Sequence, residues 1–228
     1  MSWWLPNRTE PKVAVAPSLL SADLLHLAEE MEDAQDAGAD LFHLDIMDGH
    51  FVDNLSYGPH FARAICKTSR IPVDCHLMVE DPLDYAMRFL DAGVSCVSFH
   101  LELPLDHGAI VRQIQKKGGR AGLALNPASP LREREHRALF AGCDLFLVMS
   151  VHPGFAGQAF DRSVLPKIEQ LRAWREADGH GCVLEIDGGI DAETAPLARE
   201  AGAEILVSGS SFFGSQDYPA ITRSLRGA

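Results

Sequence analysis

The sequence predicts an α/β protein that folds as a single (β/α)8 TIM barrel, because a short motif and a series of apolar runs recur along it. In four places an Ala-Gly pair follows a helix-like segment and precedes an apolar run, at Gly38, Gly93, Gly142 and Gly202. Glycine at this point ends a helix in a left-handed conformation and turns the chain into a strand. These glycines lie about 50 to 60 residues apart, which corresponds to two βα units of roughly 25 to 30 residues each.

The other strands lie between these repeats. Ile71-Pro72, Gly118-Gly119 and the segment 179–181 each precede an apolar run that is nearly continuous, as in parallel strands buried on both faces. Helical spacing fills the intervals, for example in 21–37 and 162–176, and Ser21 and Asp23 offer caps for the first helix. In chain order, the predicted strands are 13–17, 41–45, 73–77, 96–100, 120–125, 145–149, 183–187 and 205–208.

Eight alternating βα units favour a closed barrel over a doubly wound open sheet, which is the alternative. An open sheet would not bring the ends of the second, third and seventh strands to one point. In a barrel, the carboxyl ends of all strands meet at one mouth.

Length, charge and cysteine usage fit one barrel domain of 228 residues. We expect residues 1–12 to be an N-terminal extension, with Trp3 and Trp4 packed on the barrel or on a partner subunit, and 13–228 to form the catalytic barrel.

The net charge of −12 argues against binding to nucleic acid or to an anionic membrane. Neither a signal peptide nor a membrane span of about 20 apolar residues is visible. Five scattered cysteines predict free thiols and a cytoplasmic protein.

Polar residues end several predicted strands, and a barrel would gather them around one cavity. Any one His or Asp there is more often structural than a ligand. Two imidazoles and two carboxylates from three strands, at His43, Asp45, His76 and Asp187, can together bind one divalent metal. This ligand set suits Zn²⁺, Fe²⁺, Mn²⁺ or Co²⁺ better than Mg²⁺. The polar strand ends are Ser18, His43, Asp45, His76, His100, Glu102, Asn126, Ser150 and Asp187.

Glycine-rich segments follow the last three predicted strands, at 150–158, 187–189 and 208–211. Backbone N–H groups beside glycines can approach an anion closely, and the loops after strands 7 and 8 commonly hold phosphate in these barrels. Although most glycine pairs are only turns, three at adjacent strand ends predict a phosphorylated substrate. The sequence contains no Gly-x-Gly-x-x-Gly or Walker loop, so we expect no nucleotide cofactor.

Met47, Met78 and Met149 lie at or just beyond predicted strand ends, beside these residues. From the residues alone, ordinary barrel core is the favoured interpretation. A soft apolar lining around a reacting carbon is the alternative.

Five motifs in order resemble the ribulose-phosphate 3-epimerase family, and the resemblance runs from about Val13 to the C-terminus. It implies an isomerase with a barrel of the ribulose-phosphate-binding type. It also implies dependence on a metal and a place in carbohydrate metabolism, in the pentose phosphate pathway, interconverting ribulose 5-phosphate and xylulose 5-phosphate. The motifs are APSLLSAD at 16–23, HLDIMDGHFV at 43–52, DCHLMV at 74–79, MSVHPGF at 149–155 and DGGI at 187–190.

Carried over by position, the resemblance makes His43, Asp45, His76 and Asp187 the ligands of one divalent metal ion per subunit. Asp45 and Asp187 become the two acid/base groups, facing opposite sides of the substrate's C3 carbon. Met47, Met78 and Met149 match the methionines that line the substrate site in this family, so the resemblance favours that role over ordinary barrel core. Substrate contacts fall to Ser18, His76, Gly154, Phe155, Ala156, Gly157, Gly188, Gly189, Gly209 and Ser210.

The chain departs from the family at three positions: His152 replaces a usual Asn, Ala156 a usual Gly and Asp53 a usual Pro. Ala156 should avoid a positive φ. His152 keeps open a hexulose-phosphate epimerase, acting for instance on allulose 6-phosphate.

Two further alternatives are a non-catalytic barrel that binds metal or sugar phosphate, and a metal-dependent aldolase or decarboxylase. The latter would need a cation for the departing group, and no Lys ends a predicted strand. We expect a homo-oligomer with a phosphorylated ketose as substrate.

Overall fold

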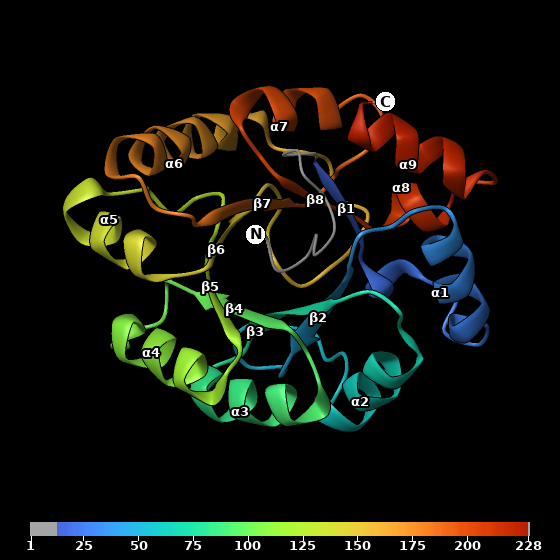
Figure 1. Cartoon of the computed structure of the whole chain (residues 1–228), viewed down its shortest axis with the longest axis horizontal. Coiled ribbons are helices and arrows are strands. Elements are labelled where there is room, and N and C mark those ends of the chain that lie inside the picture. The colour runs from blue at the N-terminus through green and yellow to red at the C-terminus, as the bar shows by residue number, and fades with distance from the viewer. Residues whose placement is uncertain (1–12, 228) are drawn as a thin grey trace.

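The protein is a single (β/α)8 barrel in a computed structural model that describes residues 13–227. The predicted extension, with Trp3 and Trp4, lies outside the described residues. Helices form an outer ring around the strands (Figure 1). The strands are β1 (Ala14–Pro17), β2 (Phe42–Met47), β3 (Val73–Met78), β4 (Cys96–His100), β5 (Arg120–Leu125), β6 (Leu145–Met149), β7 (Val183–Asp187) and β8 (Ile205–Ser208).

These strands agree with the predicted ones to within about two residues at each end. The α-helices are α1 (Leu27–Asp36), α2 (Pro59–Thr68), α3 (Pro82–Ala92), α4 (His107–Lys117), α5 (Glu133–Gly142), α6 (Leu165–Asp178), α7 (Ala195–Ala201), α8 (Ser210–Phe213) and α9 (Tyr218–Arg226). Two short 3-10 turns, η1 (Leu19–Ser21) and η2 (Arg162–Val164), precede α1 and α6.

The first helix begins later than predicted. Asp23 does not cap a helix; its carboxylate accepts the Leu25 N–H at 2.9 Å and its carbonyl accepts the His26 N–H at 3.0 Å. This local turn competes with helix formation, so α1 starts only at Leu27. The segment 162–176 likewise begins with a 3-10 turn before α6.

Neighbouring strands are parallel, in the order β1-β8-β7-β6-β5-β4-β3-β2. The seam between β1 and β2 is closed by a parallel bridge between Ser18 and His43. Farther down the seam, the Val15 N–H donates to Asp40 Oδ2 at 2.9 Å, and Arg226 donates to the same oxygen. A buried carboxylate therefore continues the pairing of the two segments, and the bridge itself includes His43, a predicted metal ligand.

Two large apolar clusters form most of the core, one inside the barrel and one between the barrel and its helices. The larger one fills the space between strands and helices, with Phe42, Leu44 and Phe146 among its members. The smaller one fills the interior, with Leu145, Leu147 and Met149 from β6. Because alternate residues of a strand point to opposite faces, the nearly continuous apolar runs supply both clusters.

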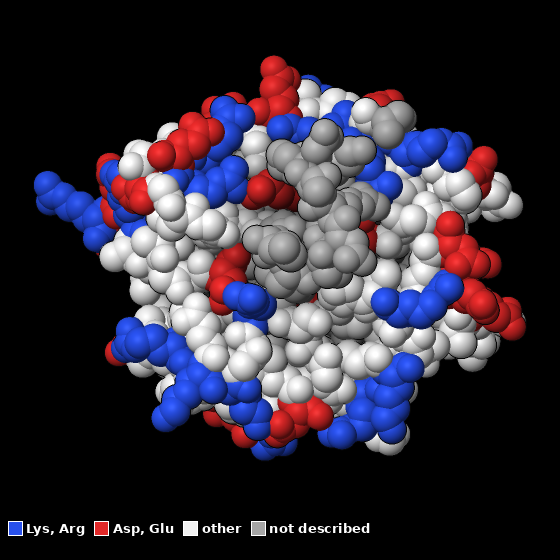
Figure 2. Space-filling view, viewed as in Figure 1, with Lys and Arg blue, Asp and Glu red and all other residues white. Residues whose placement is uncertain are grey.

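The cysteines are free, as predicted, and the face in Figure 2 carries charges of both signs. All five cysteines are free, and Cys75, Cys96, Cys143 and Cys182 are buried. Charged side chains of both signs are interspersed around the rim of the face in Figure 2. Among the described residues, no helix is long and apolar enough to cross a membrane.

Gly122 offers a direct test of the interior packing. A Cβ there would lie 2.8 Å from Ser98 Cβ and 2.9 Å from Leu145 Cδ2. We expect Gly122→Ala to lower the free energy of unfolding by about 1 to 3 kcal/mol, since a full core does not accept an added methyl group without strain. Urea denaturation measures the change.

Gly142→Ala is the matched control, because a Cβ at the end of α5 meets no atom within 4 Å. It should leave stability within about 0.5 kcal/mol of the wild type. Equal stability of both variants would contradict the packing described for the interior.

Candidate metal and substrate site

Three strands each send a pair of ionisable side chains into the barrel at positions two residues apart. The pairs are His43 and Asp45 on β2, Asp74 and His76 on β3, and Glu185 and Asp187 on β7. The register of β2 and β3 sets Asp45 beside His76 and His43 beside Asp74. Strand alternation thus produces two polar layers, with Asp45, His76 and Asp187 nearer the carboxyl ends of the strands.

The four predicted ligands come together. His43, Asp45, His76 and Asp187 each offer one ligand atom, and these atoms lie within 4.8 Å of one another. Asp45 Oδ1 lies 3.6 Å from both His43 Nε2 and His76 Nδ1. Both ring nitrogens are buried and have no hydrogen-bond partner among the described residues. Two orphaned imidazole nitrogens facing carboxylates are the donor set that a divalent cation of the Zn²⁺, Fe²⁺, Mn²⁺ or Co²⁺ type accepts.

The other ring nitrogen of His43, Nδ1, faces Asp74 and Glu185 in the second polar layer. His43 Nδ1 hydrogen-bonds to Asp74 Oδ2 at 3.0 Å and lies 3.7 Å from Glu185 Oε1. Since an ionised carboxylate can only accept, Nδ1 carries a hydrogen, and Nε2 is the nitrogen left to face Asp45. Burial would lower the pKa of His43, but the charges of Asp74 and Asp45 outweigh burial and raise the pKa, so a metal ion on Nε2 would displace a proton there. Sequence reasoning missed Asp74 and Glu185 as partners, although each stands two residues before a candidate ligand and therefore on the same face.

Asp45 is also held from β1, because Ser18 Oγ donates to Asp45 Oδ2 at 2.6 Å. Burial alone would raise the pKa of Asp45, but the neighbouring imidazoles of His43 and His76 outweigh burial and hold the pKa below its usual range. Burial, reinforced by the negative charge of Asp45, raises the pKa of Asp187 to about 7. Two neighbouring carboxyl groups therefore differ in their affinity for a proton.

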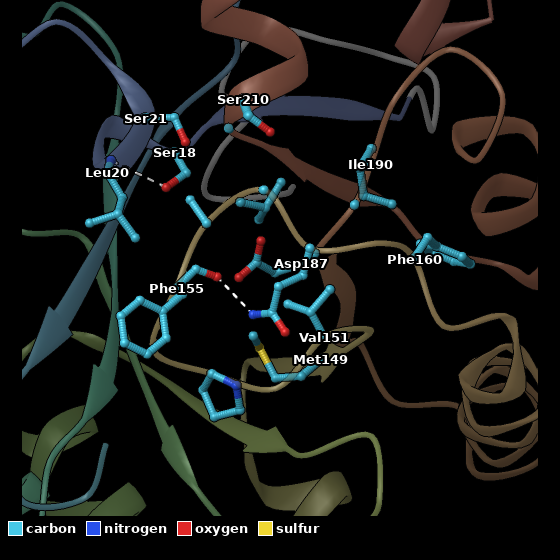
Figure 3. Close-up of a pocket in the computed structure, with 18 of the residues that line it drawn as sticks. Ser18, Leu20, Ser21, Met149, Val151, Phe155, Phe160, Asp187, Ile190 and Ser210 are labelled. Carbon is cyan, nitrogen blue, oxygen red and sulfur yellow. Dashed lines mark hydrogen bonds between the residues drawn. The ribbon is translucent and has the colours of Figure 1, made fainter. Parts of the chain in front are cut away.

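A cavity of about 350 Å³ opens above this layer, between the loops that follow β1, β6, β7 and β8 (Figure 3). Asp187 points into it, and Met149, Val151 and Ser210 are also visible around it in the close-up. The predicted substrate residues that line it are Ser18, Gly154, Phe155, Ala156, Gly157, Gly188, Gly189, Gly209 and Ser210. His76 is fully buried and does not line the cavity, so its contact with substrate stays a prediction.

Two glycines of the lining are also required by the backbone. Gly188 and Gly189 have φ angles of 113° and 59°. A Cβ on Gly189 would lie 2.5 Å from the Phe160 backbone nitrogen, so the loop after β7 packs tightly against the segment after β6. Ala156 has no positive φ, as predicted, because positive φ among the described residues is confined to glycines.

The methionines lie where the family resemblance expects them. Met47, Met78 and Met149 line the cavity and are nonetheless buried. They form its apolar wall beside Asp45 and Asp187. Their position does not decide between the two interpretations, cavity lining and barrel core, because these side chains both line the cavity and are buried.

Sequence reasoning also missed Arg162, which lines the cavity from η2. It is the one Lys or Arg among the described lining residues, and its side chain is exposed. No strand-end pattern could have indicated it, because it lies more than ten residues beyond the end of β6 in the sequence.

Solved structures share the fold at low sequence identity. A structure of KGPDC from Streptococcus mutans has a TM-score of 0.73 at 12% identity and covers 96% of this chain and 97% of that one. A 3-keto-L-gulonate-6-phosphate decarboxylase from Vibrio cholerae has a TM-score of 0.72 at 14% identity, covering 95% and 96%. At this identity the likeness confirms the fold alone.

Curated relatives are much closer in sequence. A ribulose-phosphate 3-epimerase of Bacillus subtilis is 42% identical over 219 residues, covering 95% of this chain and 99% of its own length. A ribulose-phosphate 3-epimerase of Methanocaldococcus jannaschii is 39% identical over 216 residues, covering 95% and 91%. The model of the ribulose-phosphate 3 epimerase family matches residues 14–213. The chain therefore belongs to the ribulose-phosphate 3-epimerase family and is an enzyme of the isomerase class.

Proposed function

We propose that the enzyme interconverts D-ribulose 5-phosphate and D-xylulose 5-phosphate, with one divalent metal ion bound by His43, Asp45, His76 and Asp187. The observation that carries this proposal is the pair of carboxyl groups beside the cavity, Asp45 and Asp187, whose ligand atoms lie within 4.8 Å of those of His43 and His76.

Epimerisation at C3 requires a proton to leave one face of the carbon and another to arrive on the opposite face. A single base would tend to return the proton to the face from which it came. With Asp45 ionised and Asp187 protonated, one carboxyl group can remove the C3 proton while the other donates to the opposite face. The roles exchange in the reverse direction.

The substrate would be held in two places, near C2 and C3 by the metal site and at its phosphate by the glycine-rich loops. When bound, a divalent cation would act as a Lewis acid for the negative charge that develops on the C2 and C3 oxygens. Ser18 keeps the Asp45 carboxylate oriented. At the other end, Gly188, Gly189 and Gly209, with Ser210, offer backbone N–H groups to the phosphate, and Arg162 adds a positive charge.

His152 supports a second candidate, a hexulose-phosphate 3-epimerase acting on a sugar such as allulose 6-phosphate. This imidazole lines the cavity where the family usually has an amide, so a longer sugar could meet it. The same two carboxyl groups would act on that substrate.

An aldolase or decarboxylase fits less well. No Lys lines the cavity among the described residues, and the Lys167 ammonium group donates instead to the carbonyls of Asn126, Pro127 and Ser129. A barrel that only binds sugar phosphate would not need two carboxyl groups of opposite protonation.

We further propose that the enzyme is cytoplasmic and forms a homo-oligomer.

Hydrogen exchange tests the reaction and the substrate together. The metal-loaded protein is incubated in D₂O with ribulose 5-phosphate or with allulose 6-phosphate, and C3 deuteration and products are followed by NMR. We expect deuterium at C3 and xylulose 5-phosphate from the first sugar, with slower reaction of the second. Exchange with neither sugar would leave the binding barrel as the better interpretation.

The two-base assignment is tested by Asp45→Asn and Asp187→Asn at saturating metal. Each should slow interconversion by at least about a hundredfold, since a positioned acid or base contributes roughly 10²- to 10⁴-fold. Each variant keeps one carboxyl group, so residual C3 exchange should favour opposite epimers in the two variants. Substantial interconversion by either variant would refute the assignment.

Arg162 is tested by Arg162→Gln, with kcat/KM for ribulose 5-phosphate measured at several ionic strengths. We expect a loss of roughly fivefold at low salt, the equivalent of about 1 kcal/mol for a solvent-exposed charge pair, and a smaller loss at high salt. Arg112→Gln on the exposed side of α4 is the matched control and should have no effect. A loss independent of salt would show that Arg162 acts by shape rather than charge.

A further inference from the structure

A chain of hydrogen bonds leads away from His76 on the side opposite its free nitrogen. His76 Nε2 lies 2.8 Å from His100 Nε2, and His100 Nδ1 lies 3.0 Å from Glu102 Oε2. Both imidazoles are fully buried, whereas the Glu102 side chain is 22% exposed. The chain therefore joins the candidate metal ligand on β3 to the surface, through the end of β4.

The acceptor at the end of this chain fixes every hydrogen along it. An ionised carboxylate only accepts, so His100 Nδ1 carries the hydrogen that Glu102 receives. Two ring nitrogens 2.8 Å apart share one hydrogen, and with His100 Nε2 as the acceptor, His76 Nε2 is the donor. The lone pair of His76 is left on Nδ1, the atom that lies 3.6 Å from Asp45 Oδ1 and has no hydrogen-bond partner among the described residues.

We propose that His100 and Glu102 are positioning residues that hold His76 in the one tautomer able to bind the metal. The inference rests on the metal site of the proposed function and extends it to two side chains that do not contact the metal. His43 is held in this way by Asp74 directly, whereas His76 is held through an intervening imidazole. Partners of this kind typically change metal affinity by about 10- to 100-fold.

Glu102 is itself held in place from two directions. The Asn126 N–H donates to Glu102 Oε1 at 2.8 Å, and Lys167 fixes the same loop by donating to the carbonyls of Asn126 and Pro127. Burial alone would raise the pKa of Glu102, but hydrogen bonds from His100, Ser129 and the Asn126 N–H outweigh it and lower the pKa to about 2. The end of the chain is thus a fixed carboxylate rather than a mobile surface group.

The orientation of His100 has a packing component too. The Phe51 ring lies 4.6 Å from the His100 ring, centroid to centroid. A purely structural His100 would serve as a filler between Phe51 and His76, and an apolar side chain of similar size would replace it. The positioning role predicts a different result, because Leu cannot accept the His76 hydrogen while Gln can.

Metal affinity therefore separates the two roles. Zn²⁺ binding to wild type, His100→Leu and His100→Gln is measured at constant pH by competition with a chromophoric chelator, and the stability of each metal-free protein is measured by thermal denaturation. We expect His100→Leu to bind Zn²⁺ about 10- to 100-fold more weakly, with metal-free stability unchanged or increased. His100→Gln should recover most of the affinity.

His180→Leu is the matched control. His180 is another largely buried imidazole, packed on Phe140 just before β7, and it takes no part in the chain. It should bind Zn²⁺ like the wild type. Glu102→Gln keeps an acceptor but loses the charge, so its affinity should fall between those of the wild type and His100→Leu, and it provides the test if His100→Leu does not fold.

The outcomes are distinct. Affinity of His100→Leu and Glu102→Gln within about twofold of the wild type would overturn the positioning role and leave the metal site intact. Equal loss of affinity and of metal-free stability in His100→Leu and His100→Gln would show a packing role and also overturn it. A wild-type protein that binds no Zn²⁺, Mn²⁺ or Co²⁺ would instead contradict the metal dependence of the proposed function.

Discussion

Closure of a parallel barrel around ionisable side chains is the constraint on which the rest of the site depends. Alternate residues of β2, β3 and β7 point inward, so the polar positions on these strands enter a space without bulk water. Buried carboxylates and imidazoles must then satisfy one another or bind a cation. The chain meets this requirement with pairs such as His43 with Asp74 and Ser18 with Asp45. Among the described residues, several buried atoms of the cluster remain unpaired. Two of them, His43 Nε2 and His76 Nδ1, face Asp45, and the others are Asp74 Oδ1 and both carboxylate oxygens of Glu185.

The site also lies at the seam of the sheet. β1 and β2 are joined through the bridge between Ser18 and His43, and the Asp40 carboxylate completes the seam below it. The contact that closes the barrel is thus continuous with the Ser18 hydrogen bond that orients Asp45. The seam and the site therefore share Ser18 and His43, although the first strand supplies no proposed ligand.

The sequence predicted the fold and the convergence of His43, Asp45, His76 and Asp187, because both follow from strand boundaries and spacing. That these four residues bind a metal stays a proposal. Ala-Gly pairs marked helix ends, and His43 with Asp45 revealed an inward-facing pair through spacing alone. The start of α1 was predicted wrongly, because the Asp23 turn depends on a side-chain hydrogen bond that competes with a cap of the same chemistry. Arg162 could not be found, since its place at the cavity depends on how the segment after β6 folds back. The sequence showed His100 and Glu102 as polar residues at a strand end. That they form a hydrogen-bond chain from His76 could be seen only from the distances in the structure.

The central claim is that this buried cluster binds a single divalent cation through groups on three strands. Anomalous X-ray diffraction from crystals of the Co²⁺-loaded protein tests it most directly. We predict one anomalous peak within coordination distance of His43 Nε2, His76 Nδ1 and the carboxylates of Asp45 and Asp187. A peak elsewhere, or none in this cluster at saturating Co²⁺, would contradict the claim.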